Sequence, residues 1–572
     1  MLKNYFWTFL FCLLCIHYTN AAVSVSSVFT SNMVLQQDMP VPLWGTAAAN
    51  ENIEITASWG QVVNVKTATD GKWKTTIQTP KAISGQAPQY TVAFKGTSNT
   101  VMLSNVLIGD VWLCSGQSNM EYAMTPGLPY TRGVANYAAE IAAANYPNIR
   151  LFKVSRNAQS APATTCPGTW QECNPTNIPS MSGVAYYFAR ELYQNKDINI
   201  PIGLLMTYYG GSPCEAWTKK EVLMADTELK AKFIDPYDAT FTGVSTSNKP
   251  TWLYNGMVAP LVSYAIKGAL WYQGESNMAT TALYPKLWKA MIQDWRTAWG
   301  QGNFPVYYVQ LPAYGNSAWP AFRDMQTKLL TTPNTGMAVT IDIVDSEPGN
   351  IHPMNKLEVG QRLALWALAK TYHQNVVFCG PMYKSKTIVG NKIIISFQEA
   401  TLGTGLKSKN GLALTNFQIA GANNVYYTAT AIINGNTVEV SSSSVSAPTN
   451  VAFANVSTAC PNLVNMEGLP ASPFKTDTWD NAVIIEGNLT AVSQVESASL
   501  KIYPNPVSDK LIVNSQLPIK NIDIYDISGK KVFSKNSNFT AGINASLLRS
   551  GIYFLKLKQV DGQVFDRKFV KI

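Results

Sequence analysis

Over about residues 106–378, short apolar segments alternate with amphipathic ones, which leaves few folds open to this part of the chain. In the clearest amphipathic segment, large apolar residues recur every four positions from Leu287 to Trp299, the spacing of one helix face. The apolar segments are nearly continuous, as in strands covered on both faces, and such strands separated by helices form a buried, mostly parallel sheet. The segments expected to be its strands are 106–114, 148–154, 202–208, 266–272, 304–311 and 336–343.

The sequence on either side of this region has a different pattern. Residues 22–105 contain short apolar runs between Gly, Pro and Asn turns, which predicts a β-sandwich. Residues 379–495 are β-rich and are expected to associate with the central domain, which spans 106–378. Residues 498–572 contain strands of their own and form a separate module. A chain of 572 residues is too long for one core, so several domains are expected.

Residues 1–21 have the pattern of a secretory signal peptide. Lys3 supplies the positive charge, residues 6–16 the apolar stretch, and Thr19-Asn20-Ala21 a cleavage site. The apolar stretch is too short to anchor the mature protein in a bilayer. We therefore expect export through the periplasm, to the medium or the outer-membrane surface.

Six cysteines lie outside the leader, and in an exported protein some should pair. The first expected disulfide joins Cys166 to Cys173, and the second joins Cys379 to Cys460. Cys114 and Cys214 are expected to be buried free thiols. The spacing of these cysteines is not that of a zinc site, so neither a metal nor another cofactor is predicted.

The formal net charge of +9 raises the question of a nucleic-acid partner. Most of this charge lies in the last module, because the sequence from residue 501 onward contains 12 Lys and Arg but only five Asp and Glu. The rest of the chain is close to neutral and has no basic stripe that could follow a phosphate backbone. We therefore expect no nucleic-acid partner.

Four polar motifs follow predicted strands. They are Gly116-Gln117-Ser118-Asn119, Gly210-Gly211-Ser212-Pro213, Gln273-Gly274-Glu275-Ser276-Asn277 and Asn350-Ile351-His352-Pro353. Each alone is an ordinary turn or helix cap. Sites in open α/β sheets form beyond the carboxyl ends of the strands, so these distant motifs are expected to converge there.

Ser118 and His352 are the natural catalytic couple among these residues. A serine nucleophile needs a base that is neutral near pH 7, and imidazole suits this task best. Outside the leader the chain has only two histidines, His352 and His373, and His373 lies near the end of a helix-like run. With an ordinary imidazole, activity should fall below about pH 6–6.5.

Several strings of the sequence carry a family resemblance. They are Asn32-Met33-Val34-Leu35-Gln36-Gln37, the run Ile108 to Met120, the run Trp271 to Asn277, His352-Pro353 with Lys356, and Gly468 to Phe474. Through them, residues 26–480 resemble the SGNH (GDSL-like) hydrolases and, among these, the sialate O-acetylesterase family of carbohydrate esterases. The resemblance implies a multidomain protein: a flavodoxin-like α/β hydrolase domain, with a mostly parallel sheet in three layers, flanked by β-sandwich domains.

The resemblance also implies roles for individual residues. Ser118 would be the nucleophile and His352 the general base and acid. The N–H groups of Ser118 and Gly211 and the side-chain amide of Gln273 would form the oxyanion hole. Further residues expected to line the site are Gln117, Asn119, Glu275 and Asn277.

The sequence departs from the wider superfamily at one position. Many of its members carry an Asp three residues before the histidine, and here that position is Gly349. Two alternatives remain open: a backbone carbonyl near Gly349 orients the imidazole, or Asp342 or Asp345 does so. We favour the carbonyl, which would make the site a Ser–His dyad.

The last module resembles the C-terminal sorting domain of the type IX secretion system of Bacteroidetes. The resemblance covers 498–572, from the opening Tyr503-Pro504-Asn505-Pro506 to the closing Lys571-Ile572. It implies the type IX machinery as a partner, and a generic immunoglobulin-like module is the alternative.

The chain as a whole is expected to be an exported esterase that removes acetyl groups from sialic acid. Acetylxylan or another polysaccharide is the alternative substrate, and a non-catalytic carbohydrate-binding protein is the rival function.

Overall fold

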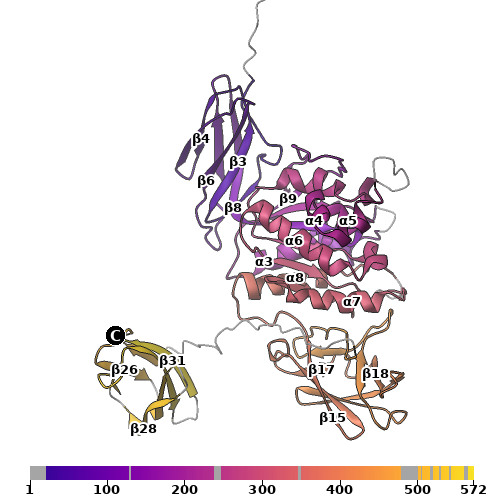
Figure 1. Ribbon diagram of the computed structural model, residues 1–572. Helices are drawn as coiled ribbons and strands as arrows, with labels where there is room; N and C mark the ends of the chain where they lie inside the picture. Colours follow the sequence, from indigo (N-terminus) through magenta and orange to yellow (C-terminus); the bar gives the residue numbers. More distant parts are fainter. Residues whose placement is uncertain are drawn as a thin grey trace, which may run out of the picture. The chain divides into compact units, whose positions relative to one another are not determined.

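The computed structural model divides the chain into two compact units, Met1–Gly487 and Asn488–Ile572 (Figure 1), and each is described by itself. The structure describes residues 21–127, 131–237, 246–344, 350–477, 500–503, 505–515, 519–526, 530–539, 543–559 and 564–572. The predicted signal peptide therefore lies almost wholly outside the described residues. No described helix is long and apolar enough to cross a membrane.

The first part of unit 1 is made of strands, as the sequence predicts for 22–105. The strands are β1 Ser24–Val25, β2 Val34–Gln36, β3 Pro40–Thr46, β4 Asn52–Ala57, β5 Gln61–Lys66, β6 Lys72–Gln78 and β7 Tyr90–Lys95. One sheet has the order β1-β3-β6, while β5, β4 and β7 pair in this order and β7 then pairs with β8. Trp73 of β6 and Phe94 of β7 have ring centroids 5.7 Å apart, so the two sheets share a core.

The strand β8, Thr100–Gly116, is 17 residues long and belongs to two parts of the fold. Its first half pairs antiparallel with β7, and its second half pairs parallel with β11 and β12. The expected domain boundary at 105 and 106 therefore falls inside one continuous strand. Asp110, in the middle of β8, is fully buried and accepts hydrogen bonds from Gln36, Gln37 and Tyr372. β8 thus connects the N-terminal strands rigidly to the central sheet.

The central sheet has the strand order β10-β9-β11-β8-β12-β13-β14. Its further strands are β9 Tyr146–Lys153, β10 Trp170–Cys173, β11 Ile202–Tyr208, β12 Gly268–Tyr272, β13 Val306–Val309 and β14 Thr335–Ala338. All pairs are parallel except that of β10 with β9. The six predicted strands are confirmed, although the last two are shorter than expected. After β8 the chain builds one side of the sheet and then crosses to the other, so the switch point lies at β8.

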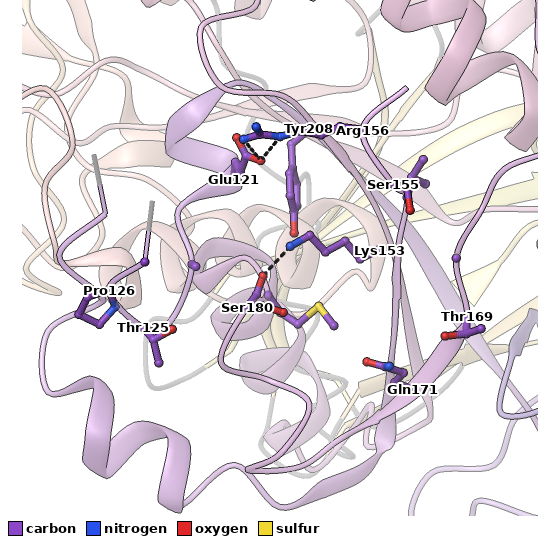
Figure 2. Close-up of a pocket in the computed structure, with 15 residues that line it drawn as sticks. Glu121, Thr125, Pro126, Lys153, Ser155, Arg156, Thr169, Gln171, Ser180 and Tyr208 are labelled. Atoms are coloured by element: carbon purple, nitrogen blue, oxygen red, sulfur yellow. Dashed lines mark hydrogen bonds and ion pairs between the residues drawn. The ribbon is translucent and has the colours of Figure 1, made fainter. Parts of the chain in front are cut away.

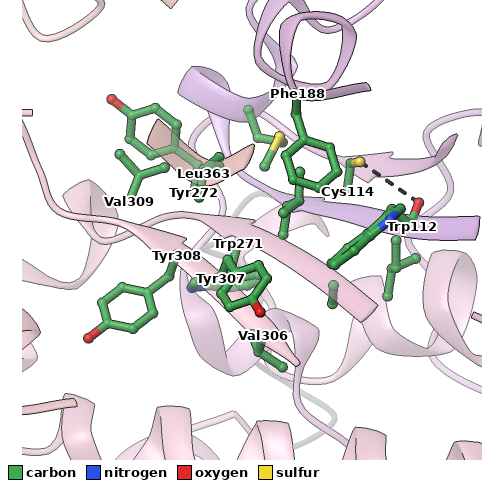
Figure 3. Close-up of a cluster of buried hydrophobic side chains, with 14 of the residues drawn as sticks. Trp112, Cys114, Phe188, Trp271, Tyr272, Val306, Tyr307, Tyr308, Val309 and Leu363 are labelled. Carbon is green, nitrogen blue, oxygen red and sulfur yellow. Dashed lines mark hydrogen bonds between the residues drawn. The ribbon is translucent and has the colours of Figure 1, made fainter. Parts of the chain in front are cut away.

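Helices cover both faces of this sheet. The longer helices are α3 Gly183–Gln194, α6 Tyr284–Trp299, α7 Trp319–Lys328 and α8 Lys356–Trp366, and the shorter ones are α1 Ser118–Glu121, α2 Tyr137–Ala142, α4 Lys220–Ala225 and α5 Thr227–Phe233. Trp112 of β8 packs against Phe188 of α3 at 5.0 Å (Figure 3). Trp271 of β12, which is paired with Ser115, packs against Trp295 of α6 at 5.8 Å. Because side chains alternate along a strand, Trp112 and Ser115 point to opposite faces, and so α3 and α6 cover opposite faces.

The β-rich region after the central domain forms three small sheets. Their orders are β15-β16-β21-β20, β19-β18-β22-β24 and β17-β23, from β15 Tyr383–Val389, β16 Lys392–Phe397, β17 Leu406–Ser408, β18 Phe417–Ala420, β19 Tyr426–Thr428, β20 Thr430–Asn434, β21 Thr437–Ser441, β22 Asn450–Phe453, β23 Leu463–Asn465 and β24 Phe474–Lys475. Arg323 of α7 is fully buried and donates to the carbonyls of Val456 (2.6 Å) and Ser457 (3.3 Å). This region therefore packs on the central domain.

The described residues of unit 2 form strands joined by turns. They are β25 Leu500–Tyr503, β26 Lys510–Ser515, β27 Ile519–Asp526, β28 Lys531–Phe539, β29 Ile543–Asn544, β30 Gly551–Gln559 and β31 Val564–Lys571, in sheets of order β25-β26-β29 and β28-β27-β30-β31. Its hydrophobic core includes Leu511, Ile522 and Leu557 and is separate from the core of unit 1.

The two expected disulfides are wrong, because all six cysteines are free thiols in the structure. The backbone of Cys166 is bound to the Ser27 hydroxyl, whereas Cys173 ends β10 and pairs with Tyr146 of β9. These two cysteines are thus held by different neighbours. Cys379 is buried and Cys460 is exposed. The prediction for Cys114 and Cys214 is confirmed, since both are buried thiols.

Candidate active site

Ser118 lies just beyond the carboxyl end of β8, at the switch point of the sheet. β8 ends at Gly116, which has a φ of +143°, and a Cβ there would lie 2.1 Å from the carbonyl oxygen of Tyr272. Only glycine fits this turn, after which Gln117 donates its N–H to the same carbonyl at 3.0 Å. Ser118 then opens the short helix α1, where the first N–H groups have no acceptor within the helix.

His352 meets Ser118 directly: the distance from its Nε2 to Ser118 Oγ is 2.7 Å. Asn350 fixes the backbone at this histidine, because its Oδ1 accepts the His352 N–H and its Nδ2 donates to the His352 carbonyl, both at 2.9 Å. The sequence therefore correctly predicts that these two residues converge. Serine and imidazole in this contact can act as nucleophile and base.

Asn119 connects the segments that carry Ser118 and His352. Its Nδ2 donates to Glu275 Oε1 (2.6 Å) and to the carbonyl of Ile351 (2.9 Å), and its Oδ1 accepts from Lys356 Nζ (2.6 Å). Asn119 and Lys356 are both fully buried. The sequence places Asn119 and Glu275 at the site but gives no sign of these contacts, which depend on the tertiary fold.

The turn after β11 brings a second backbone N–H to the site. Gly210 donates its N–H to Glu121 Oε2 at 2.8 Å, which ties the turn to α1. The next residue, Gly211, has a φ of +77° and is exposed. Within the described part of the chain its N–H has no acceptor, so this donor is available to a ligand. Glu121 is a contributor that the motif analysis did not identify.

Gln273 lies beside these donors, but its amide is bound within the protein. Its Nε2 donates to Asn277 Oδ1 (2.7 Å) and to the carbonyl of Ser212 (3.3 Å), while its Oε1 accepts from Tyr284 (2.8 Å). Asn277 in turn donates to Glu215 Oε2 at 2.8 Å. Gln273 must exchange one of these bonds before it can donate to a substrate oxygen.

Gln117, which directly precedes α1, contacts the turn that carries Gln273. Its Oε1 lies 3.4 Å from the N–H of Gly274 and 3.3 Å from the N–H of Ser276, both of which donate to it. Gln117 is nearly fully buried. Its side chain therefore supports the turn after β12.

Of the two carboxylates proposed to orient the imidazole, the structure describes Asp342. Asp342 binds Arg362 at 2.6 Å and Lys409 at 2.9 Å. Burial would raise its pKa, but these two cations hold it below the ordinary value. This carboxylate is thus engaged with cations of α8 and the β-rich region. Asp345 and Gly349 lie outside the described residues.

His373 lies at the opposite edge of the sheet. It is exposed and lines a second cavity with residues that precede β12, β13 and β14, such as Lys267, Pro305 and Asn334. Ser118 follows the carboxyl end of β8, which runs parallel to β12. The five residues of β12 alone separate these edges by roughly 16 Å.

A cavity of about 550 Å³ opens beside α1 (Figure 2). Its lining includes Glu121, Lys153, Arg156 and Tyr208. Arg156 donates from Nε to Glu121 Oε1 at 2.9 Å, and Lys153 donates to the carbonyl of Ser180 at 2.9 Å. Arg156 also lies over the ring of Tyr209. Two cationic side chains therefore line a cavity that begins one helical turn from Ser118.

The surroundings of His352 shift its titration toward acid. Burial, and secondly the charge of Lys356, lower the pKa of His352 to about 4. The base must be neutral to accept a proton, so a lower pKa moves the loss of activity to lower pH. We therefore expect the acid limb of kcat/KM near pH 4 in place of the pH 6–6.5 that the unperturbed imidazole gives. Rates of ester hydrolysis from pH 3.5 to 8 test this, and a limb above pH 6 contradicts it.

Comparison with known proteins shows which enzymes this chain is similar to. The family described as carbohydrate esterase, sialic acid-specific acetylesterase, matches residues 108–369. The sialate O-acetylesterase of Homo sapiens is 30% identical over 407 residues, covering 65% of this chain and 75% of that protein. The enzyme of the same name from Mus musculus is 29% identical and covers 65% and 78%. The secretion system C-terminal sorting domain matches residues 501–571.

One solved structure is similar over most of unit 1. It is a carbohydrate acetylesterase from Xanthomonas citri, with a TM-score of 0.71 and 33% identity, and the match covers 80% of this chain and all of that one. The sorting domain directs the protein to the cell surface or the extracellular space by type IX secretion. With the fold, the Ser118–His352 contact and these relatives together, the chain belongs to the sialate O-acetylesterase family of carbohydrate esterases.

Proposed function

We propose that the protein is an exported O-acetylesterase that removes acetyl groups from sugar hydroxyls through an acetyl-serine intermediate. The observation that carries this proposal is the 2.7 Å contact between Ser118 Oγ and His352 Nε2 at the switch point of the sheet. The available N–H of Gly211 and the family membership support it.

The reaction follows from the geometry in two stages. Ser118 Oγ attacks the acetyl carbonyl carbon while His352 Nε2 takes the hydroxyl proton, and the imidazolium then protonates the departing sugar oxygen. Water next attacks the acetyl-serine, giving its proton to His352 and its hydroxyl to the acyl carbon. His352 returns that proton to Ser118 as the C–O bond breaks, which releases acetic acid and restores the site.

The oxyanion formed in each stage needs hydrogen-bond donors. The N–H groups of Ser118 and Gly211 are the two that support this role best, since neither is used by α1 or by the turn. One such donor contributes roughly 2.7–4 kcal/mol to lowering the barrier. We propose Gln273 as a third donor, which becomes available when substrate replaces one of its internal bonds.

Acetylated sialic acid is the substrate we propose first. Its support is the cavity beside α1, where Lys153 and Arg156 outnumber the carboxylate of Glu121, and this net positive charge suits a carboxylated sugar better than a neutral one. Acetylated xylan is the second candidate, because an esterase exported to the cell surface or the medium meets acetylated polysaccharide there. Acetate release from O-acetylated sialosides, acetylxylan and a small chromogenic acetate tests both. Release from none of them, with sugar binding retained, would favour a carbohydrate-binding protein.

The finer architecture belongs to the same proposal. We infer that the central α/β domain is an SGNH hydrolase flanked by β-sandwiches, with a signal peptide at 1–21 and a sorting domain at 498–572. The long strand β8 and the switch-point position of Ser118 support the first inference. The separate hydrophobic core of unit 2 supports the last.

Export and catalysis should be separable. All proposed site residues lie in unit 1, and unit 2 has its own core. A chain that ends at Gly487 should keep at least about half of the esterase activity, because domains with separate cores fold independently. In the native host it should remain inside the cell envelope. Fractionation with an activity assay checks both, and normal export of the shortened chain would contradict the role of the tail.

A further inference from the structure

Three polar side chains, the fully buried Asn119 and Lys356 and the partly buried Glu275, connect the segments that carry Ser118 and His352. Asn119 comes from α1, Glu275 from the turn after β12, and Lys356 is the first residue of α8. Lys356 Nζ donates to Asn119 Oδ1 at 2.6 Å, and Asn119 Nδ2 donates to Glu275 Oε1 at 2.6 Å and to the Ile351 carbonyl at 2.9 Å. Asn119, the residue after Ser118, thus holds Ile351, the residue before His352.

The amide of Asn119 has one geometry that satisfies all three partners. Its two Nδ2 hydrogens point to Glu275 and to Ile351, and its oxygen receives the Lys356 ammonium. If the ammonium were removed, the Asn119 oxygen would be left buried, and the amide would be free to turn. Rotation of this amide would release the Ile351 carbonyl and, with it, the position of His352.

Burying this lysine is unfavourable unless its charge is compensated. Lys356 is 0% exposed, and its ammonium lies over the rings of Tyr122 (4.6 Å) and Tyr272 (5.5 Å). These cation–π contacts and the nearby Glu275 carboxylate offset part of the desolvation. A well-packed apolar side chain is often at least as stable as a buried ion pair. The presence of a charge here therefore calls for a role other than stability.

We propose that Lys356 is a positioning residue for catalysis: through Asn119, it fixes the Ile351 carbonyl and so holds His352 Nε2 on Ser118 Oγ. This inference rests on the proposed esterase function. It is independent of which acetylated sugar the enzyme takes, because none of the three side chains lines the cavity beside α1.

The charge of Lys356 has a second consequence, which serves as a specific readout. Among the described residues, the groups near the imidazole include the Ser118 hydroxyl, the Tyr122 ring and Lys356, and Glu275 lies one hydrogen bond further away, on Asn119. Burial and then Lys356 lower the pKa of His352. Loss of the ammonium should therefore raise this pKa and move the acid limb of kcat/KM to higher pH. A change in packing that kept the charge would not move this limb, so the limb reports the ammonium and the fall in kcat reports its hold on Asn119.

The test compares Lys356→Met, Lys356→Arg and Lys370→Met in the full chain with a chromogenic acetate. Lys370 is the matched control, since its ammonium also lies over a ring, that of Phe378 at 4.4 Å, but at the far edge of the sheet. Lys356→Met should lower kcat about 100-fold and leave KM within about threefold, as expected for a misplaced catalytic group. Its ratio of kcat/KM at pH 4 to that at pH 8 should fall at least about twofold, because pH 4 lies at the pKa of His352. Lys356→Arg should keep the wild-type ratio, and Lys370→Met should match wild type throughout.

Two outcomes overturn the proposal: wild-type kcat and pH profile in Lys356→Met, or the same losses in Lys370→Met. If Lys356→Met does not fold, as judged by circular dichroism, Asn119→Asp carries the test. This variant keeps the acceptor for Lys356 but loses the donor to Ile351, so kcat should again fall about 100-fold with KM little changed. Wild-type kcat in Asn119→Asp would contradict the proposal. Absence of ester hydrolysis by wild type would instead reject the esterase function itself.

Discussion

Replacing Ser118 with alanine is expected to lower kcat by roughly four to six orders of magnitude, the loss seen when the nucleophile of a serine hydrolase is removed. The covalent route ends without the hydroxyl, and what remains is water attack assisted by the oxyanion donors. Acetate release under saturating substrate measures the loss. The fold should persist, because Ser118 is not part of the hydrophobic core and the substitution removes a single hydroxyl oxygen.

Ser115 provides a matched control for this variant. It lies three residues earlier in β8, is fully buried, and its hydroxyl has no hydrogen-bond partner among the described residues. Ser115→Ala removes the same kind of atom three residues earlier in the chain and should stay within about twofold of wild-type kcat, since no reacting group depends on it. If Ser118→Ala kept more than about a tenth of wild-type activity, Ser118 could not be the nucleophile.

The sequence predicts the sheet well because each strand of a buried parallel sheet is recognisable by itself. Continuous apolar segments such as 202–208 need no partner to be identified, and this one matches β11 in both bounds. The strands at 304–311 and 336–343 end early, as β13 and β14. In both places the apolar sequence continues beyond the last paired strand residue into loop segments that pack against α7 and the β-rich region. Apolar character records burial, and burial does not distinguish a strand from the buried loop that follows it.

The site was predictable to the extent that topology determines it. Motifs that follow parallel strands must meet at one edge, which is why Ser118 and His352 could be paired across 234 positions. The internal bonds of Gln273 and the contacts of Asn119 could not be predicted. Amide side chains have several possible partners, and the choice among them depends on distances that exist only in the folded chain.

The disulfide predictions failed because closeness in sequence does not determine how two thiols are oriented. Cys166 and Cys173 are close in sequence, and exported proteins often contain disulfides, but a disulfide also needs the two thiols to face each other. β10 pairs Cys173 with β9, while Cys166 is held at Ser27. Burial raises the pKa of both thiols, so neither is a reactive thiolate.

Replacing His352 with alanine is expected to lower kcat about as much as Ser118→Ala does. The serine is a weak nucleophile without a base to take its proton, and His352 is the imidazole in contact with Ser118 Oγ, at 2.7 Å. His373→Ala is the matched control: this imidazole is exposed at the opposite edge of the sheet, and the variant should stay within about twofold of wild type.

The double variant gives the sharpest test, because residues that act as one unit are not additive. If Ser118 and His352 serve one proton transfer, then losing the second after the first removes nothing further, and the double variant should match either single variant within about tenfold. If they contributed independently, their losses would multiply and the double variant would lie several further orders of magnitude below. Single-turnover acetate release for wild type, the two single variants and the double variant decides between these results. A multiplied loss, or a larger loss in His373→Ala than in His352→Ala, would reject the Ser118–His352 couple as the catalytic unit.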